Sequence, residues 1–313
     1  MIYMNRSISL AVAFLAVSLF LVTFTLTSSA QTLYSCESPF GATNPFLYTV
    51  DPDTGATLTT TEITLEGETV RGCNGLAKDP TTGVCYMIVS VAGEQGIPAP
   101  RILATIDVDT GVATEIGNTG LAFAGIAFTP DGTLYGLTGD QNGSAIPTIY
   151  TINKTNGTPT EFLPLVNTDD GEALGSSPID GLLYRMNGRP PINVDQIFES
   201  INPANMNVSE INLSGPDEID ETTALTFLSG NTLLAGDTDP SLYTLTTNGV
   251  VNEIGTMDHV SKGLAFDCGV APPPPPAGVN IPTLSEWGLI AMAAVLGIIG
   301  LFAARSRKGL HKV

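Results

Sequence analysis

A single histidine, His259, lies between the two apolar ends of the chain, and it limits the chemistry that the sequence offers. A Ser-His-Asp hydrolase site would have to use this residue, yet the sequence contains no G-x-S-x-G nucleophile motif. The cysteines and histidines also lack the spacing that zinc or haem sites require. Carboxylates are therefore the remaining candidates for a functional site.

Many carboxylates fall in predicted loops. Asp51-Pro52-Asp53-Thr54-Gly55 and Asp107-Val108-Asp109-Thr110-Gly111 look like fragments of a calcium loop, but the full EF-hand pattern with a distal Glu is absent and the same residues suit tight turns. The loops at 164–176, 214–222 and 255–261 are predicted to crowd one rim of the domain. We expect either a solvated acidic surface or weak calcium binding there, by some of Asp169, Asp170, Glu172, Asp217, Asp220 and Glu221.

The charge of the chain excludes one class of partner. Residues 31–280 hold 30 of the 31 acidic residues and seven of the 12 basic residues, which gives this part a net charge of −23. Proteins bind nucleic acid by placing Lys and Arg against phosphates, so a nucleic-acid partner is excluded. Because 43% of the residues are hydrophobic, the chain can bury a large core and is not globally disordered.

The middle of the chain repeats a unit of short strands. One strand of the unit recurs with starts at residues 47, 103, 149, 198 and 242, and a second hairpin, clearest at 125–136, contains the turn Asp131-Gly132. Repeats of about 45 residues built from four strands are typical of β-propeller blades. We therefore predict an all-β, five-bladed propeller over residues 31–269, with four and six blades as the nearest alternatives.

The two ends of the repeat complement each other. The last copy stops at Asp267-Cys268, after its inner strand, and the missing next strand is found at Thr32-Leu33-Tyr34-Ser35. A blade made of three N-terminal strands and one C-terminal strand would close the ring. A closed ring leaves no open sheet edge for aggregation.

All four cysteines lie in this domain. Cys73 and Cys85 fall on consecutive strands of one predicted blade, and Cys36 and Cys268 fall on two strands of the closing blade. Because disulfides are stable in an exported domain, we predict the pairs Cys73–Cys85 and Cys36–Cys268. These pairs require at least one bulge or register shift in the strand pairing. Free buried thiols are the alternative.

Both ends of the chain carry targeting features. Residues 1–30 predict a secretory signal peptide, since Arg6 precedes an apolar run and Ser28-Ser29-Ala30 offers small residues for cleavage; an uncleaved anchor is the alternative. Residues 270–280 form a proline-rich linker. Residues 281–313 follow, with a predicted transmembrane helix at 287–304 and a basic tail whose charge places it in the cytoplasm.

The residues Ile281-Pro282-Thr283-Leu284-Ser285-Glu286-Trp287-Gly288, followed by an apolar helix and a basic tail, resemble the IPTL-CTERM sorting signal. The resemblance covers about residues 280–309. It implies export in a Gram-negative bacterium, an inner-membrane intermediate, cleavage near Pro282-Thr283 by an exosortase-like protease, and a final location at the cell surface or outside the cell. A plain transmembrane anchor is the alternative.

Two functions remain open for the exported domain. The first is a non-catalytic binding module that presents loops to a partner such as extracellular polysaccharide or a surface protein. The alternative is an extracellular carbohydrate-active enzyme with paired carboxylates at the channel mouth. We favour the first, because the predicted inner strands read Gly-Leu-Ala, Gly-Ile-Ala and Ala-Leu-Thr and carry no carboxylate at these positions. No cofactor is expected apart from the candidate calcium.

Overall fold

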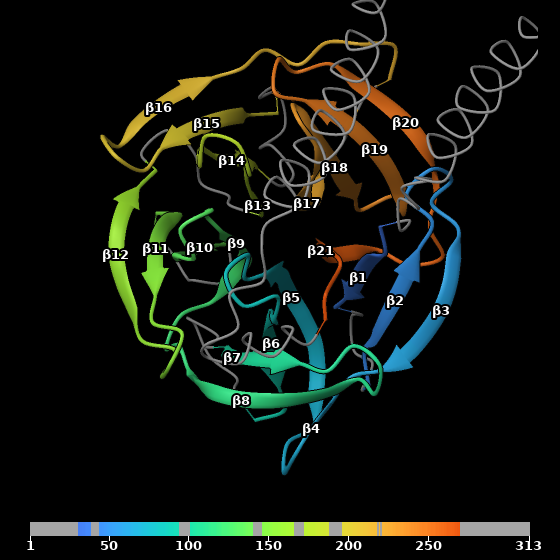
Figure 1. Ribbon diagram of the computed structural model, residues 1–313, viewed down its shortest axis with the longest axis vertical. Coiled ribbons are helices and arrows are strands. Elements are labelled where there is room, and N and C mark those ends of the chain that lie inside the picture. The colour runs from blue at the N-terminus through green and yellow to red at the C-terminus, as the bar shows by residue number, and fades with distance from the viewer. Residues whose placement is uncertain are drawn as a thin grey trace, which may run out of the picture. The chain divides into compact units, whose positions relative to one another are not determined.

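The computed structural model describes residues 31–38, 44–93, 101–139, 146–165, 172–187, 196–217, 219 and 221–269, all within one compact unit, residues 1–271. In these ranges the chain forms 21 strands in five sheets around a central axis (Figure 1). None of the described residues belongs to a helix that is long and apolar enough to cross a membrane. The predicted signal peptide at 1–30 and transmembrane helix at 287–304 lie outside the described residues.

Each sheet is one blade of a five-bladed propeller, which confirms the predicted fold. The closing blade contains β21 (Ser261–Phe266), β1 (Leu33–Glu37), β2 (Phe46–Val50) and β3 (Thr57–Glu62). Blade 1 contains β5 (Val70–Lys78), β6 (Cys85–Val91), β7 (Ile102–Ile106), β8 (Val112–Asn118) and β4 (Thr64–Leu65). Blade 2 contains β9 (Phe123–Phe128), β10 (Leu134–Thr138), β11 (Thr148–Ile152) and β12 (Pro159–Pro164). Blade 3 contains β13 (Ala173–Ser176), β14 (Leu183–Met186), β15 (Phe198–Asn202) and β16 (Asn207–Glu210), and blade 4 contains β17 (Thr222–Ser229), β18 (Thr232–Asp237), β19 (Ser241–Thr246) and β20 (Val251–Thr256).

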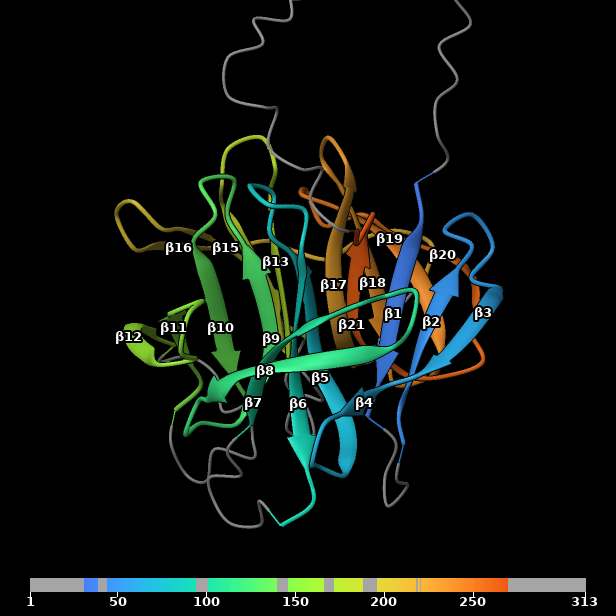
Figure 2. The same ribbon diagram turned by 60° about the horizontal axis from the view of Figure 1, so that its bottom comes forward.

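The ring closes as predicted, with the N-terminal strand beside the last inner strand. Strand β1 pairs antiparallel with β21, so that Leu33 lies opposite Phe266 and Cys36 lies opposite Gly263. The backbone N–H of Asp267 also donates to the carbonyl oxygen of Thr32 at 2.9 Å. Residues from the two ends of the domain therefore share one blade, and the strands lie side by side in both views (Figures 1 and 2).

The innermost strands alternate small and large residues, and this pattern interlocks the blades. In β5, Leu76 packs in the core shared with the closing blade, whereas Ala77 packs in the core shared with blade 2. A Cβ atom added to Gly75 would lie 3.1 Å from Cγ1 of Ile126, and one added to Gly263 would lie 2.9 Å from Cβ of Leu76. Such approaches are too close for a larger residue, because protein interiors are packed at crystal-like density. The Gly-Leu-Ala and Gly-Ile-Ala segments thus form the contact between neighbouring blades.

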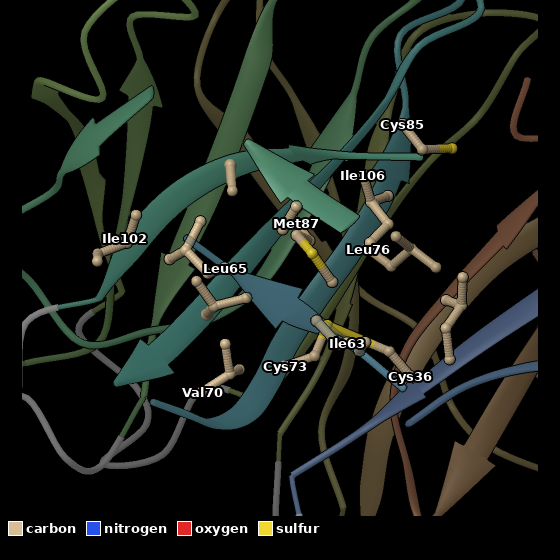
Figure 3. Packing of buried hydrophobic residues seen from close by; sticks show 14 of the residues in the cluster. Cys36, Ile63, Leu65, Val70, Cys73, Leu76, Cys85, Met87, Ile102 and Ile106 are labelled. Atoms are coloured by element: carbon tan, nitrogen blue, oxygen red, sulfur yellow. A yellow bond between two sulfur atoms is a disulfide. The ribbon is translucent and has the colours of Figure 1, made fainter. Parts of the chain in front are cut away.

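The predicted cysteine pairing is wrong. The disulfides are Cys36–Cys73 and Cys85–Cys268, with Cα–Cα distances of 5.8 and 5.3 Å, and both connect the closing blade to blade 1. Figure 3 shows the Cys36–Cys73 bond.

The strand registers explain why the cysteines do not pair within blades. Cys73 lies opposite Val89, whereas Cys85 lies opposite Lys78 at the other end of the same strand pair. Four residues along a strand span about 13 Å, well beyond the roughly 7 Å between Cα atoms that a disulfide tolerates. Because of a register shift between them, Cys73 and Leu76 lie on the same face of β5, the face toward the closing blade. Cys85 lies on this side of blade 1 as well. Blades stack face to face, so each cysteine meets its partner across a blade interface.

The inner strands run along the axis, and the connections between strands fall on two opposite faces (Figure 2). One face carries the turns that follow the inner strands, such as 79–84, 129–133 and 177–182, and we call it the short-turn face. The opposite face carries the connections between blades and those between the second and third strands of each blade, and we call it the long-loop face. Glu172 and Glu221 of the predicted acidic residues directly precede the inner strands β13 and β17 and belong to the long-loop face.

Candidate functional site

A pocket of about 290 Å³ opens on the short-turn face, where the five inner strands end. Its floor consists of one aliphatic side chain from each blade: Leu76, Ile126, Leu174, Leu225 and Leu264. Two residues further along each strand, the wall consists of Lys78, Phe128, Ser176, Phe227 and Phe266. Side chains two apart on a strand point to the same side, so the five strands present the same two layers to the axis. We call this the axial pocket.

The floor residues also close the channel. Beyond them, the space bounded by the same aliphatic side chains, by Gly75 and Gly125 and by Lys262 has a volume of about 10 Å³, too small for more than a single water molecule. Towards the long-loop face, the Lys262 Nζ atom lies 3.4 Å from a carboxylate oxygen of Glu172. This ion pair joins the closing blade to blade 3, which are not neighbours. Within the described residues, the axial pocket thus ends at this layer of aliphatic side chains.

The wall residue Phe128 is held in place by blade 1. Its ring makes an edge contact with Tyr86 at 5.2 Å between centroids, and the Lys154 Nζ atom lies 5.4 Å from its centroid. Lys154 also forms an ion pair of 2.7 Å with the buried carboxylate of Asp79. Burial alone would raise the pKa of Asp79, but hydrogen bonds from Lys154 and Thr81 outweigh it and lower this pKa. These contacts therefore fix the position of Phe128 in the wall of the axial pocket without the help of a ligand.

Two charged residues in the described part of the chain, Asp267 and Lys78, line the axial pocket, and they differ in their surroundings. The carboxylate of Asp267, whose backbone has a positive φ of 51°, accepts hydrogen bonds from the Thr32 N–H at 3.0 Å and from Gln31 Nε2 at 3.4 Å. Lys78 is half-buried and forms no ion pair with any residue in the described ranges. The carboxylate of Asp267 is thus engaged by Gln31 and Thr32, whereas the amino group of Lys78 is available to a ligand. Neither residue was predicted from the sequence to be part of a site.

The predicted calcium ligands do not form a common site among the described residues. The Glu172 carboxylate pairs with Lys262, and the Asp217 carboxylate accepts the backbone N–H of Glu253 at 2.8 Å. Glu221 contacts Asp237 through its own backbone N–H. Asp169, Asp170 and Asp220 lie outside the described residues, and no group of three metal-ligating side chains occurs within them. Calcium binding stays an untested prediction.

The two fragments that look like calcium loops are turns. Asp51 Oδ1 accepts the backbone N–H of Asp53 at 2.9 Å, and Asp107 Oδ1 accepts that of Asp109 at 3.0 Å. Gly55 and Gly111 follow with positive φ, as the backbone of these turns demands. Asp side chains that bond to the backbone two residues on are turn formers. The structural role accounts for both fragments.

His259 belongs to a buried hydrogen-bond network. Its Nε2 atom lies 2.7 Å from Ser35 Oγ, which also donates to Ser261 Oγ at 2.8 Å, and its ring stacks on Tyr48 with 3.6 Å between centroids. Both serines are fully buried. Within the described part of the chain, Nδ1 has no hydrogen-bond partner, so no carboxylate orients the ring as in a catalytic triad. The arrangement is structural.

This network predicts a loss of stability in mild acid. Burial lowers the pKa of His259 to about 4, although the nearby Asp258 partly opposes this shift. A lowered pKa means that the unfolded chain takes up a proton below about pH 6.5 while the native protein does not, so stability is complete above pH 6.5 and falls as the pH approaches 4. The expected loss across this window is about 3 kcal/mol.

The measurement is the urea midpoint of the propeller domain between pH 7 and pH 4.5, compared with that of His259→Gln. The variant should lose most of the pH dependence. Asp79 does not interfere, since its lowered pKa makes it titrate below this window. An equally steep pH dependence in His259→Gln would contradict the assignment.

Comparisons with known proteins support the sorting signal and the fold. Residues 281–307 match the IPTL-CTERM motif, which confirms the resemblance. No curated protein matches the chain. Among solved structures, a candidate exo-β-1,3-galactanase from Bifidobacterium bifidum s17 is similar at 14% identity and a TM-score of 0.53, over 76% of this chain and 92% of that chain.

Two further solved structures are less similar. TolB from Acinetobacter baumannii shares 17% identity over 75% of this chain at a TM-score of 0.47, and the chain spans about half, 54%, of the TolB chain. The major Malassezia sympodialis allergen Mala s 1 shares 10% identity over 71% of this chain and 74% of that chain, also at 0.47. At these identities the likenesses concern fold alone.

Proposed function

We propose that this protein is an exported binding module without catalytic activity, which is sorted to the cell surface and binds a small ligand in the axial pocket. The observation that carries the proposal is the pocket itself, a concave cavity with an apolar floor and a few polar groups on its wall. Such cavities are the usual ligand sites of proteins. Its volume of about 290 Å³ is near the lower end of the range for ligand pockets, which favours a small ligand.

Export is supported by independent features. The IPTL-CTERM motif at 281–307 implies a C-terminal signal that an exosortase-like system processes. The two disulfides suit an oxidising compartment, because cytosolic thiols are kept reduced. The predicted signal peptide at 1–30 and membrane helix at 287–304 agree with this route in a Gram-negative cell.

The pocket lining favours binding over glycoside hydrolysis. Glycosidases use two carboxyl groups about 5–10 Å apart, one as acid and one as base or nucleophile. Asp267 is the one carboxylate among the described residues that line the axial pocket, and it already accepts two N–H groups from the start of the domain. The fold shared with the Bifidobacterium bifidum protein does not carry activity by itself.

The test has two arms. In a host with an exosortase, the native chain should be recovered from the cell surface or medium without its residues 1–30 and with a new C-terminus near Pro282, whereas a variant with Pro282→Ala and Thr283→Ala should remain unprocessed. Purified protein should release no new reducing ends from β-1,3- or β-1,4-linked glycans. Cytoplasmic full-length protein would overturn the export proposal, and release of reducing sugar would overturn the non-catalytic role.

A further inference from the structure

We infer that the axial pocket selects small ligands with an apolar body and a single anionic group, the chemistry of an aryl or short alkyl carboxylate, with Lys78 as the residue that binds the anion. This inference rests on the proposed function, since it names the ligand class of the same pocket.

The apolar body follows from the lower half of the pocket. Five aliphatic side chains from five blades form the floor, and three of the five wall residues above them are phenylalanines. A sugar ring would place hydroxyl groups against this floor, where the five aliphatic side chains offer no hydrogen bond, and unpaired buried hydroxyls are costly. A hydrocarbon or aromatic body suits this environment, because burying apolar surface is favourable.

The anionic group follows from Lys78. Its side chain stands on the wall two residues beyond Leu76, half-buried, with no ion-pair partner in the described ranges. A charge beside apolar side chains interacts more strongly with an opposite charge than it would in water. Asp267, the other charged wall residue, is already held by Thr32 and Gln31. Among the described residues that line the pocket, Lys78 is thus the free cation, and the carboxylate of Asp267 is engaged.

The charge of the whole domain limits the ligand to a single negative group. Residues 31–280 carry a net charge of −23, so a polyanion is strongly repelled over long distances. A monoanion is repelled much less, and the contact with Lys78 offsets this repulsion. Added salt screens the long-range repulsion more than the contact inside the pocket. The ligand class is therefore a monoanion with a compact apolar body.

The probes are three naphthalenes of equal size: 2-naphthoate, 2-naphthylmethanol and 2-naphthylmethylammonium. Calorimetry with the full chain in lipid nanodiscs, corrected with empty nanodiscs, should show at least tenfold tighter binding of 2-naphthoate than of the alcohol, with the ammonium compound weakest. Lys78→Met should weaken the binding of 2-naphthoate at least tenfold, so that 2-naphthoate no longer binds more tightly than the alcohol. Arg71→Met is the matched control, since Arg71 is an exposed cation on the same strand, and it should change nothing.

A blocking variant separates the two levels of the proposal. Thr226 is a half-buried residue of the pocket lining, and Thr226→Tyr should abolish binding of both 2-naphthoate and the alcohol while the melting temperature shows that the protein is folded. Equal binding of all three probes, or a preference that survives Lys78→Met, overturns the anionic class and leaves the binding role intact. Failure of every probe to bind, or binding unchanged by Thr226→Tyr, overturns the axial pocket as the binding site.

Discussion

Replacement of Cys85 and Cys268 by serine is expected to lower the free energy of unfolding of the propeller by about 5 kcal/mol. The disulfide joins residues separated by 183 positions, and a cross-link over such a long loop removes much of the entropy of the unfolded chain. The Cys36–Cys73 bond, with a separation of 37, should contribute about 4 kcal/mol by the same relation. The free energy of unfolding of a typical domain is only about 5–15 kcal/mol, so the variant without the Cys85–Cys268 bond should be close to unfolding.

The two double variants, Cys85→Ser with Cys268→Ser and Cys36→Ser with Cys73→Ser, serve as each other's control. Both remove one bond between the closing blade and blade 1, and they differ mainly in loop length. Urea titration of the oxidised proteins measures the two losses, and the first variant should be the less stable. A loss below 1 kcal/mol in either variant would show that the strand pairing of β1 with β21 closes the ring without covalent help.

The second large effect concerns a buried ion pair in blade 3. The Arg185 Nε atom donates to a carboxylate oxygen of Glu199 at 2.7 Å, and the two side chains are 1% and 8% exposed. Removal of one partner of such a pair leaves a buried charge without compensation, which typically costs 3–5 kcal/mol. Glu199→Ala should therefore lower the free energy of unfolding by about 4 kcal/mol.

Substitution of both partners should be far milder than loss of one. Arg185→Met combined with Glu199→Leu removes both charges and keeps apolar volume, so it should recover most of the stability lost in Glu199→Ala. Glu115→Ala is the matched control, because Glu115 is an exposed carboxylate on strand β8 of blade 1, and it should stay within about 0.5 kcal/mol of the wild type. A double variant no more stable than Glu199→Ala would show that the pair has a role beyond mutual neutralisation.

The fold could be predicted from the sequence because its signals are local. Each hairpin, such as Phe128 to Leu134 with its Asp131-Gly132 turn, is specified by residues close in the chain, and the repeat then gives the number of blades. The closing strand was also predictable, since Leu33 and its neighbours supply the one strand that the last repeat lacks.

The disulfides and the axial pocket depend on contacts between blades, which no local pattern encodes. Cys36 meets Cys73 only because β1 and β5 face each other across an interface. Phe128, Phe227 and Phe266 each read as an ordinary strand end, and they become a wall only when five strand ends converge. The sequence did contain a weak signal: four of the five inner strands, all but β13 with its Ser176, carry a bulky residue two positions after the central aliphatic residue.

The position of Cys268 has a mechanical consequence. A pull on the chain beyond Gly269 meets the bond to Cys85 before it can reach β21, because Cys268 lies between Gly269 and the end of that strand. Without this bond, tension would peel β21 from β1 one backbone hydrogen bond at a time. With it, the load passes covalently into β6 of blade 1 and is shared by two blades that a second disulfide also joins. A force applied through the C-terminus is thus carried by the blade interface that both disulfides cross.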